Sequence, residues 1–181
     1  MRTTQPLLAL AAVATSALTG LGVATPAEAV SPTQQSGAST TSHELGNVIE
    51  CTGRIHGRAA WTSLYENNTA GNVIEVNIGG DRHPLGGGRE VADGFIHAKQ
   101  VHGSVRVGGD RAVVEGYASR LRHRTPVHEE YTDAGQAIVV DGYHRRLAKD
   151  LTLTWRHRTV QLDCDNAFFY DLQVTKTDIT G

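Results

Sequence analysis

The chain has 181 residues and a formal net charge of −2, from 17 lysines and arginines against 19 aspartates and glutamates. A near-neutral balance argues against bulk electrostatic binding to nucleic acid or to a membrane, so we expect neither partner. The 9 histidines make the net charge pH-sensitive, because histidine takes up a proton as the pH falls through about 6.5.

The N-terminal segment, residues 1–29, predicts a cleaved signal peptide. Arg2 precedes an apolar Leu/Ala/Val/Thr run, and the small residues Ala27 and Ala29 mark a cleavage site. The composition of this segment is similar to that of signals from high-GC Gram-positive bacteria. We therefore expect a bacterial protein that is secreted and extracellular.

The mature chain divides into a leader and one domain. Residues 30–46 are small and polar without periodicity, which predicts a disordered leader. From residue 47 to 181 a period-two pattern dominates, and we expect a single β domain there. Ile74, Val76 and Ile78, for example, alternate with polar residues, as expected of a strand with one buried face.

Glycine-containing turns separate these alternating runs, as in Gly108-Gly109 and Ala134-Gly135. The predicted strands lie near residues 48–57, 59–66, 72–78, 95–107, 111–122, 127–132, 136–144, 150–156, 159–164 and 167–175. The predicted fold class is all-β: an antiparallel meander of about eight to ten short strands, closed into a barrel or a β-sandwich.

The two cysteines predict one disulfide. Cys51 and Cys164 lie in a chain expected to reach an oxidising compartment, where such pairs normally bond. A plain up-and-down meander, however, places them at opposite ends of their strands, whereas a disulfide needs Cα atoms within about 7 Å. Either the register is staggered, as in a sheared barrel, or one connection breaks the meander.

No catalytic signature is present. The chain has no Gly-x-Ser-x-Gly, no phosphate-binding Gly-x-x-x-x-Gly-Lys, no His-Glu-x-x-His and no Cys-x-x-Cys. His97 and His102 are five residues apart, and so are His123 and His128, which puts each pair on opposite faces of a strand. We therefore expect no metal site and no cofactor.

The most irregular segment is Gly79 to Glu90, which we expect to be a long loop. Asp81 and His83 are spaced to form a carboxylate-oriented imidazole, and they are the catalytic candidates if the protein is an enzyme. The glycine amides of this segment suit an anion. The alternative interpretation is an ordinary solvated loop.

A strict meander gathers the cationic connections on one rim. These connections are near residues 54–58, 79–90, 120–124 and 144–149, and each contains arginine, histidine or lysine. Arginine offers a planar fork for carboxylate, phosphate or sulfate. The predicted ligand-binding residues are Arg82, His83, Arg89, Arg122, Arg145 and Arg146.

Three functions are compatible with these features. The first is a secreted non-enzymatic binding module for a small or anionic ligand. The second is an extracellular enzyme that uses Asp81 and His83. The third is a protein-interaction domain, such as a protease inhibitor that inserts the 79–90 loop.

Overall fold

The computed structural model describes residues 37–79 and 84–179. The signal peptide predicted over 1–29 lies outside the described residues, and so do Asp81, Arg82 and His83. The described part contains no helix, and hence none long and apolar enough to cross a membrane.

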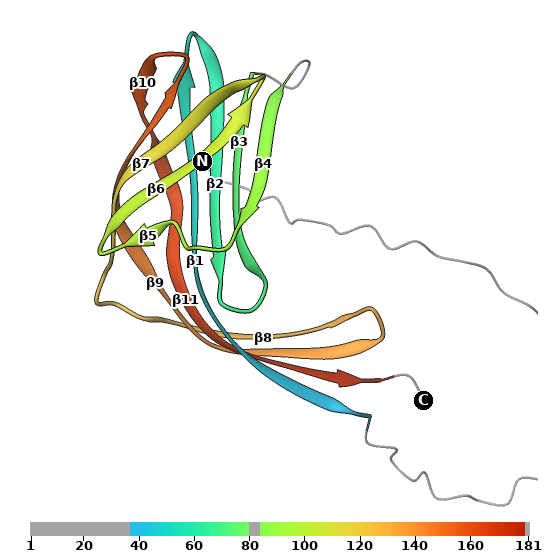
Figure 1. Cartoon of the computed structure of the whole chain (residues 1–181). Helices are drawn as coiled ribbons and strands as arrows, with labels where there is room; N and C mark the ends of the chain where they lie inside the picture. Colours follow the sequence, from blue (N-terminus) through green and yellow to red (C-terminus); the bar gives the residue numbers. More distant parts are fainter. Residues whose placement is uncertain (1–36, 80–83, 180–181) are drawn as a thin grey trace, which may run out of the picture. The chain divides into compact units, whose positions relative to one another are not determined.

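The all-β prediction is confirmed. The strands are β1 Ser39–Ile55, β2 Arg58–Asn67, β3 Gly71–Ile78, β4 Leu85–Val91, β5 Ile96–His97, β6 Gln100–Val107, β7 Asp110–Arg120, β8 Thr125–Asp133, β9 Gln136–Trp155, β10 Arg158–Gln161 and β11 Asp163–Asp178. They form one antiparallel sheet of 11 strands in the order β4-β3-β2-β1-β11-β9-β7-β6-β5, with β8 and β10 also paired to β9. The sheet curls into a half-barrel (Figure 1).

The core lies on the concave face of this half-barrel. Ile74, Val76 and Ile78 are fully buried, as their alternation predicts, and Trp155 from β9 packs in the same cluster. The Trp155 indole N–H donates to the carbonyl of Val107 at 3.2 Å, which satisfies its polar group inside the core. The apolar side chains of distant strands thus form one core cluster.

The strands are not uniformly short, because three of them continue beyond the half-barrel. They form an extension that we call the arm (Figure 1). The arm consists of the first part of β1, the last part of β11, the first part of β9 and all of β8. The prediction split β9 into two strands, at 136–144 and 150–156, but it is continuous over 20 residues. Gly142, with φ of 152°, lies within β9 where the arm joins the half-barrel.

Two further boundaries differ from prediction. The disordered leader expected over 30–46 does not reach residue 46, because β1 begins at Ser39 and pairs with β11 from there. The long loop expected over 79–90 is shorter, because Leu85–Val91 form β4 along β3. Both segments gain their strand geometry from a partner strand rather than from their own apolar pattern.

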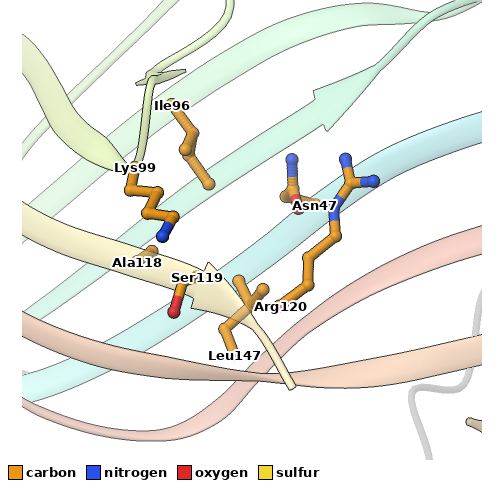
Figure 2. Close-up of a pocket in the computed structure, with 7 residues that line it drawn as sticks. All are labelled: Asn47, Ile96, Lys99, Ala118, Ser119, Arg120 and Leu147. Carbon is orange, nitrogen blue, oxygen red and sulfur yellow. The ribbon is translucent and has the colours of Figure 1, made fainter. Parts of the chain in front are cut away.

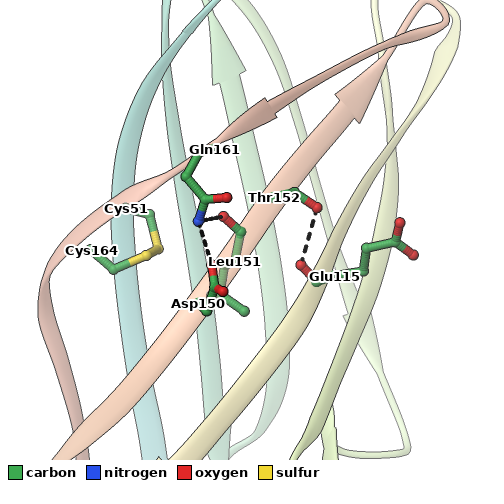
Figure 3. Close-up of a disulfide and its surroundings, with 7 residues drawn as sticks. All are labelled: Cys51, Glu115, Asp150, Leu151, Thr152, Gln161 and Cys164. Atoms are coloured by element: carbon green, nitrogen blue, oxygen red, sulfur yellow. Dashed lines mark hydrogen bonds between the residues drawn. A yellow bond between two sulfur atoms is a disulfide. The ribbon is translucent and has the colours of Figure 1, made fainter.

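The predicted disulfide is confirmed. Cys51 and Cys164 are bonded, with their Cα atoms 3.9 Å apart, and both are buried (Figure 3). The strands that are first and last in the chain, β1 and β11, are antiparallel neighbours in the sheet. Cys51 lies near the end of β1 and Cys164 near the start of β11, so the two cysteines are at the same end of this pair. The pairing register between β1 and β11 shifts between Glu50 and Thr52, and the disulfide-bonded Cys51 lies at this shift. The conflict that the sequence raised came from the predicted strand bounds, because β1 starts earlier than predicted and Cys164 belongs to β11 rather than to the end of the strand predicted over 159–164.

Candidate functional site

A cavity of about 400 Å³ lies where the half-barrel meets the arm. Its lining comes from β1, from the segment that includes β5 and its turn, from β7 and from β9 (Figure 2). The lining residues are Asn47, Ile96, Lys99, Ala118, Ser119, Arg120 and Leu147. Apolar side chains from three different segments thus share one cavity with two cations.

Lys99 reaches this cavity from a strained turn. Ala98 and Lys99, between β5 and β6, both have left-handed backbone angles, with φ of 48° and 74°. Neither is glycine or asparagine, so each costs about 1 kcal/mol or more. The amide of Ala118 donates to the carbonyl of Lys99 at 2.9 Å, which ties the turn to β7. Ala98 and Lys99 are the central residues of a two-residue hairpin turn, and the tightest hairpin turns need positive φ at both of these positions.

Arg120 is held on an aromatic face. Its guanidinium carbon lies 3.4 Å from the ring centroid of Phe169, an arrangement that leaves the edges of the guanidinium open to solvent. Figure 2 shows the guanidinium beside the Asn47 side chain. Within residues 37–79 and 84–179, neither Lys99 nor Arg120 forms an ion pair with a carboxylate.

The Glu66 carboxylate orders the chain next to the cavity. It accepts a hydrogen bond from the Asn47 side-chain amide and two more from the backbone amides of Phe95 and Ile96, the latter at 2.8 Å. A partly buried carboxylate is stabilised by such donors. Glu66 therefore fixes the orientation of Asn47 and the position of the chain at Ile96, and its own charge is already engaged.

The cavity continues into a wider groove of about 780 Å³, which shares Asn47, Ile96 and Arg120 with it. The Asp171 carboxylate in this groove accepts hydrogen bonds from His43 Nε2 and from the Tyr143 hydroxyl, each at 2.8 Å. The His43 bond, followed by the Tyr143 bond, lowers the pKa of Asp171 below its usual value. Asp171 is consequently ionised at neutral pH.

Two more arginines lie close to the ring of Tyr143, beside the groove. The guanidinium carbons of Arg124 and Arg145 lie 4.3 Å and 5.6 Å from the Tyr143 ring centroid. Arg145 Nε is buried and has no hydrogen-bond partner among the described residues. The side of the groove around Tyr143 is therefore rich in positive charge.

The predicted ligand-binding residues do not share one rim. Arg145 lies beside Tyr143, whereas Arg146 is exposed at the next position of β9. Arg122 is in the exposed connection between β7 and β8, and Arg89 is on the edge strand β4. The connection expected over 144–149 does not exist, because these residues are internal to β9. Arg82, His83 and the catalytic candidate Asp81 lie outside the described residues.

Sequence reasoning missed most of the cavity. Arg120 belongs to the basic 120–124 connection, but nothing in the local pattern marks Asn47, Glu66 or Lys99. The only available signal for Lys99 was a short Ala-Lys turn between two alternating runs. No cluster of three or more His, Cys, Asp or Glu side chains suited to a metal occurs in the part of the chain that is described.

The arm carries a pH-sensitive pair. His128 Nδ1 lies 2.6 Å from Asp141 Oδ1, and this hydrogen bond, assisted by Glu130, raises the pKa of His128. A raised pKa gives stability below the unfolded value of about 6.5, and this stability is lost as the pH rises through the folded pKa.

Asp141→Asn is thus expected to lower Tm more at pH near 5.5 than at pH near 8.5. Thermal melts measure this Tm loss, with His128→Gln as the control. A Tm loss in Asp141→Asn that is the same at both pH values would contradict the coupling.

Comparisons with known proteins give no match: no family model, no curated protein and no solved structure is significantly similar to this chain.

Proposed function

We propose that this protein is a secreted, non-enzymatic binding module that holds a small organic anion with an apolar body. The observation that carries the proposal is the pair Lys99 and Arg120, two cations without carboxylate partners in the described residues, on the wall of a partly apolar cavity. Secretion is proposed from the signal-peptide pattern, and the Cys51–Cys164 bond is consistent with an oxidising compartment.

The cavity has the chemistry of a small-ligand site. Its volume of about 400 Å³ is within the range of ligand pockets, which runs from about 300 to 1,000 Å³. Ile96, Ala118 and Leu147 offer apolar contact to the body of a ligand. Arg120 offers a planar fork to a carboxylate, sulfonate or phosphate, and its stacking on Phe169 reduces the entropy lost on binding.

The neighbouring carboxylates have hydrogen-bond partners other than these cations. Glu66 is engaged by Asn47 and by two backbone amides, and Asp171 is engaged by His43 and Tyr143. Asn47 donates its side-chain N–H to Glu66, and its side-chain carbonyl oxygen has no hydrogen-bond partner among the described residues. This oxygen suits a ligand hydroxyl. The ligand class that fits is therefore an amphipathic anion with a hydroxyl or amide group.

The proposal is tested with two fluorescent dyes that differ in charge. Anilinonaphthalene sulfonate is an aromatic anion, and N-phenylnaphthylamine is its neutral counterpart. Arg120→Gln is expected to weaken the sulfonate dye about tenfold or more, because a charge-assisted hydrogen bond contributes about 1.5 to 3 kcal/mol. The same substitution should leave the Kd of the neutral dye within about twofold. Fluorescence titration of the folded protein measures both.

Two variants act as controls. Arg122→Gln removes an exposed arginine outside the cavity and should leave both dyes unaffected. Ala118→Leu fills the cavity and should weaken both dyes, because Ala118 is a buried lining residue. Equal losses in Arg120→Gln and Arg122→Gln, or unchanged binding in Ala118→Leu, would refute binding in this cavity. Near-UV circular dichroism verifies that each variant keeps its native packing.

A further inference from the structure

A second groove, of about 450 Å³, lies where the two ends of the curled sheet meet, and we call it the seam groove. It is formed by the edge strand β4 on one side and by the β6–β7 hairpin on the other. Its lining residues are Gly87, Gly88, Arg89, Ser104, Val105, Arg106 and Arg111. None of these lines the cavity that contains Lys99 and Arg120, so the two sites are independent.

Glycine brings β4 close to β6 at the seam groove. A Cβ on Gly87 would lie 2.0 Å from the carbonyl oxygen of Arg106, so no other residue fits at this position without backbone movement. β4 pairs only with β3, and its other edge lies beside β6 without ladder pairing.

The arginines of the seam groove repel one another. Arg106 and Arg111 are directly opposite each other on adjacent strands, an arrangement that is destabilising for like charges. Arg106 donates to the carbonyl of Gly109 at 3.1 Å, which leaves its other N–H groups available. Among the described residues, none of the three arginines forms an ion pair with a carboxylate.

Nearby acids do not neutralise this charge. Asp110, next to Arg111, is bonded to Arg156 at 2.5 Å. Glu75 packs beside Gly88, where a Cβ would lie 3.8 Å from its Oε1, but it forms no ion pair with an arginine in the described residues. The lining of the seam groove consequently has an excess of positive charge.

We propose that the seam groove binds the phosphate or sulfate group of a ligand. A tetrahedral anion between Arg106 and Arg111 accepts paired N–H bonds from both guanidinium forks and cancels their mutual repulsion. Arg89 closes the groove from β4, and the Ser104 hydroxyl, on the same strand as Arg106, supplies a further donor. This site recognises a compact, highly charged group, whereas the Lys99/Arg120 cavity favours an apolar body.

The test compares Tm in inorganic phosphate, sulfate and chloride at equal ionic strength and neutral pH. Phosphate or sulfate is expected to raise Tm by about 2 to 4 °C over chloride at saturating concentration. A shift with phosphate alone identifies a phosphate ligand, and a shift with both ions identifies a general oxyanion site. The double variant Arg106→Gln/Arg111→Gln should lose most of the shift.

Two further variants separate this site from general charge effects. Arg158→Gln removes an arginine of β10 that does not line the groove and should keep the full shift. Arg111→Gln should raise Tm in chloride, because it removes the opposed charge. An undiminished shift in the double variant, or an equal loss in Arg158→Gln, would overturn the proposal. Arg120→Gln keeps the phosphate shift, so a failure of the cavity proposal is distinguishable.

Discussion

Joint replacement of Cys51 and Cys164 by alanine is expected to lower the free energy of unfolding by about 4 to 5 kcal/mol. The bond closes a loop with a sequence separation of 113, and the chain-entropy model assigns its largest stabilisation to loops of this length. It also ties the first strand in the chain, β1, to the last, β11. Since a typical domain is stable by only about 5 to 15 kcal/mol, this variant should unfold at a much lower urea concentration.

The matched control is a nearby non-covalent link between the same two strands. Asn166 on β11 donates to Glu50 on β1 at 2.6 Å, and this hydrogen bond is exposed. Asn166→Ala should cost less than about 1 kcal/mol. Wild-type protein with its disulfide reduced should unfold at the midpoint of the double-alanine variant. A double variant as stable as wild type would show that the link is not stabilising.

Gly46→Ala is expected to lower the free energy of unfolding by about 3 kcal/mol. A Cβ at Gly46 would lie 1.8 Å from the carbonyl oxygen of Glu66 and 2.3 Å from the Tyr170 hydroxyl. Tyr170 is 5% exposed and donates to that same carbonyl at 2.9 Å. Burial raises the pKa of Tyr170 well above its usual value, so the phenol remains protonated and keeps this hydrogen bond.

Urea unfolding of two other variants shows whether sterics at this contact are the cause. Tyr170→Phe added to Gly46→Ala removes the clash with the hydroxyl but keeps those with the ring Cζ at 2.5 Å and with the Glu66 carbonyl, so the double variant should remain destabilised. Gly88→Ala is the control, because its Cβ would meet nothing closer than Glu75 Cγ at 3.4 Å, an ordinary contact. It should change the free energy of unfolding by less than about 1 kcal/mol. Equal urea midpoints for Gly46→Ala and wild type would be incompatible with this packing.

Local alternation was sufficient to predict the strand class and the buried face. Ile74, Val76 and Ile78 are 0% exposed, and Leu151, Leu153 and Trp155 are also buried. In a strand the side chains alternate between faces whatever the partner strand is, so this pattern is readable without knowing the pairing. Strand ends and strand continuity were less predictable, because they depend on the partner strand.

The start of β1 shows where local reasoning is insufficient. Its Ser/Thr-rich beginning has no apolar periodicity, yet it forms a strand because β11 pairs with it. The Thr41 and Thr175 hydroxyls lie 3.1 Å apart across this ladder, although they are 134 residues apart in sequence. Cross-strand pairs of this kind stabilise a strand only when the partner is present.

The sequence by itself determined an all-β domain with one disulfide, because side-chain alternation is local and two cysteines allow only one intramolecular pairing. The tertiary structure alone decided which strands are neighbours, and with them both candidate sites. Lys99 and Arg120 share a cavity, and Arg89 joins Arg106 and Arg111 at the seam groove, only because the sheet curls. The physical reason is that sheet pairing is a long-range hydrogen-bonding choice, which residues distant in sequence make together.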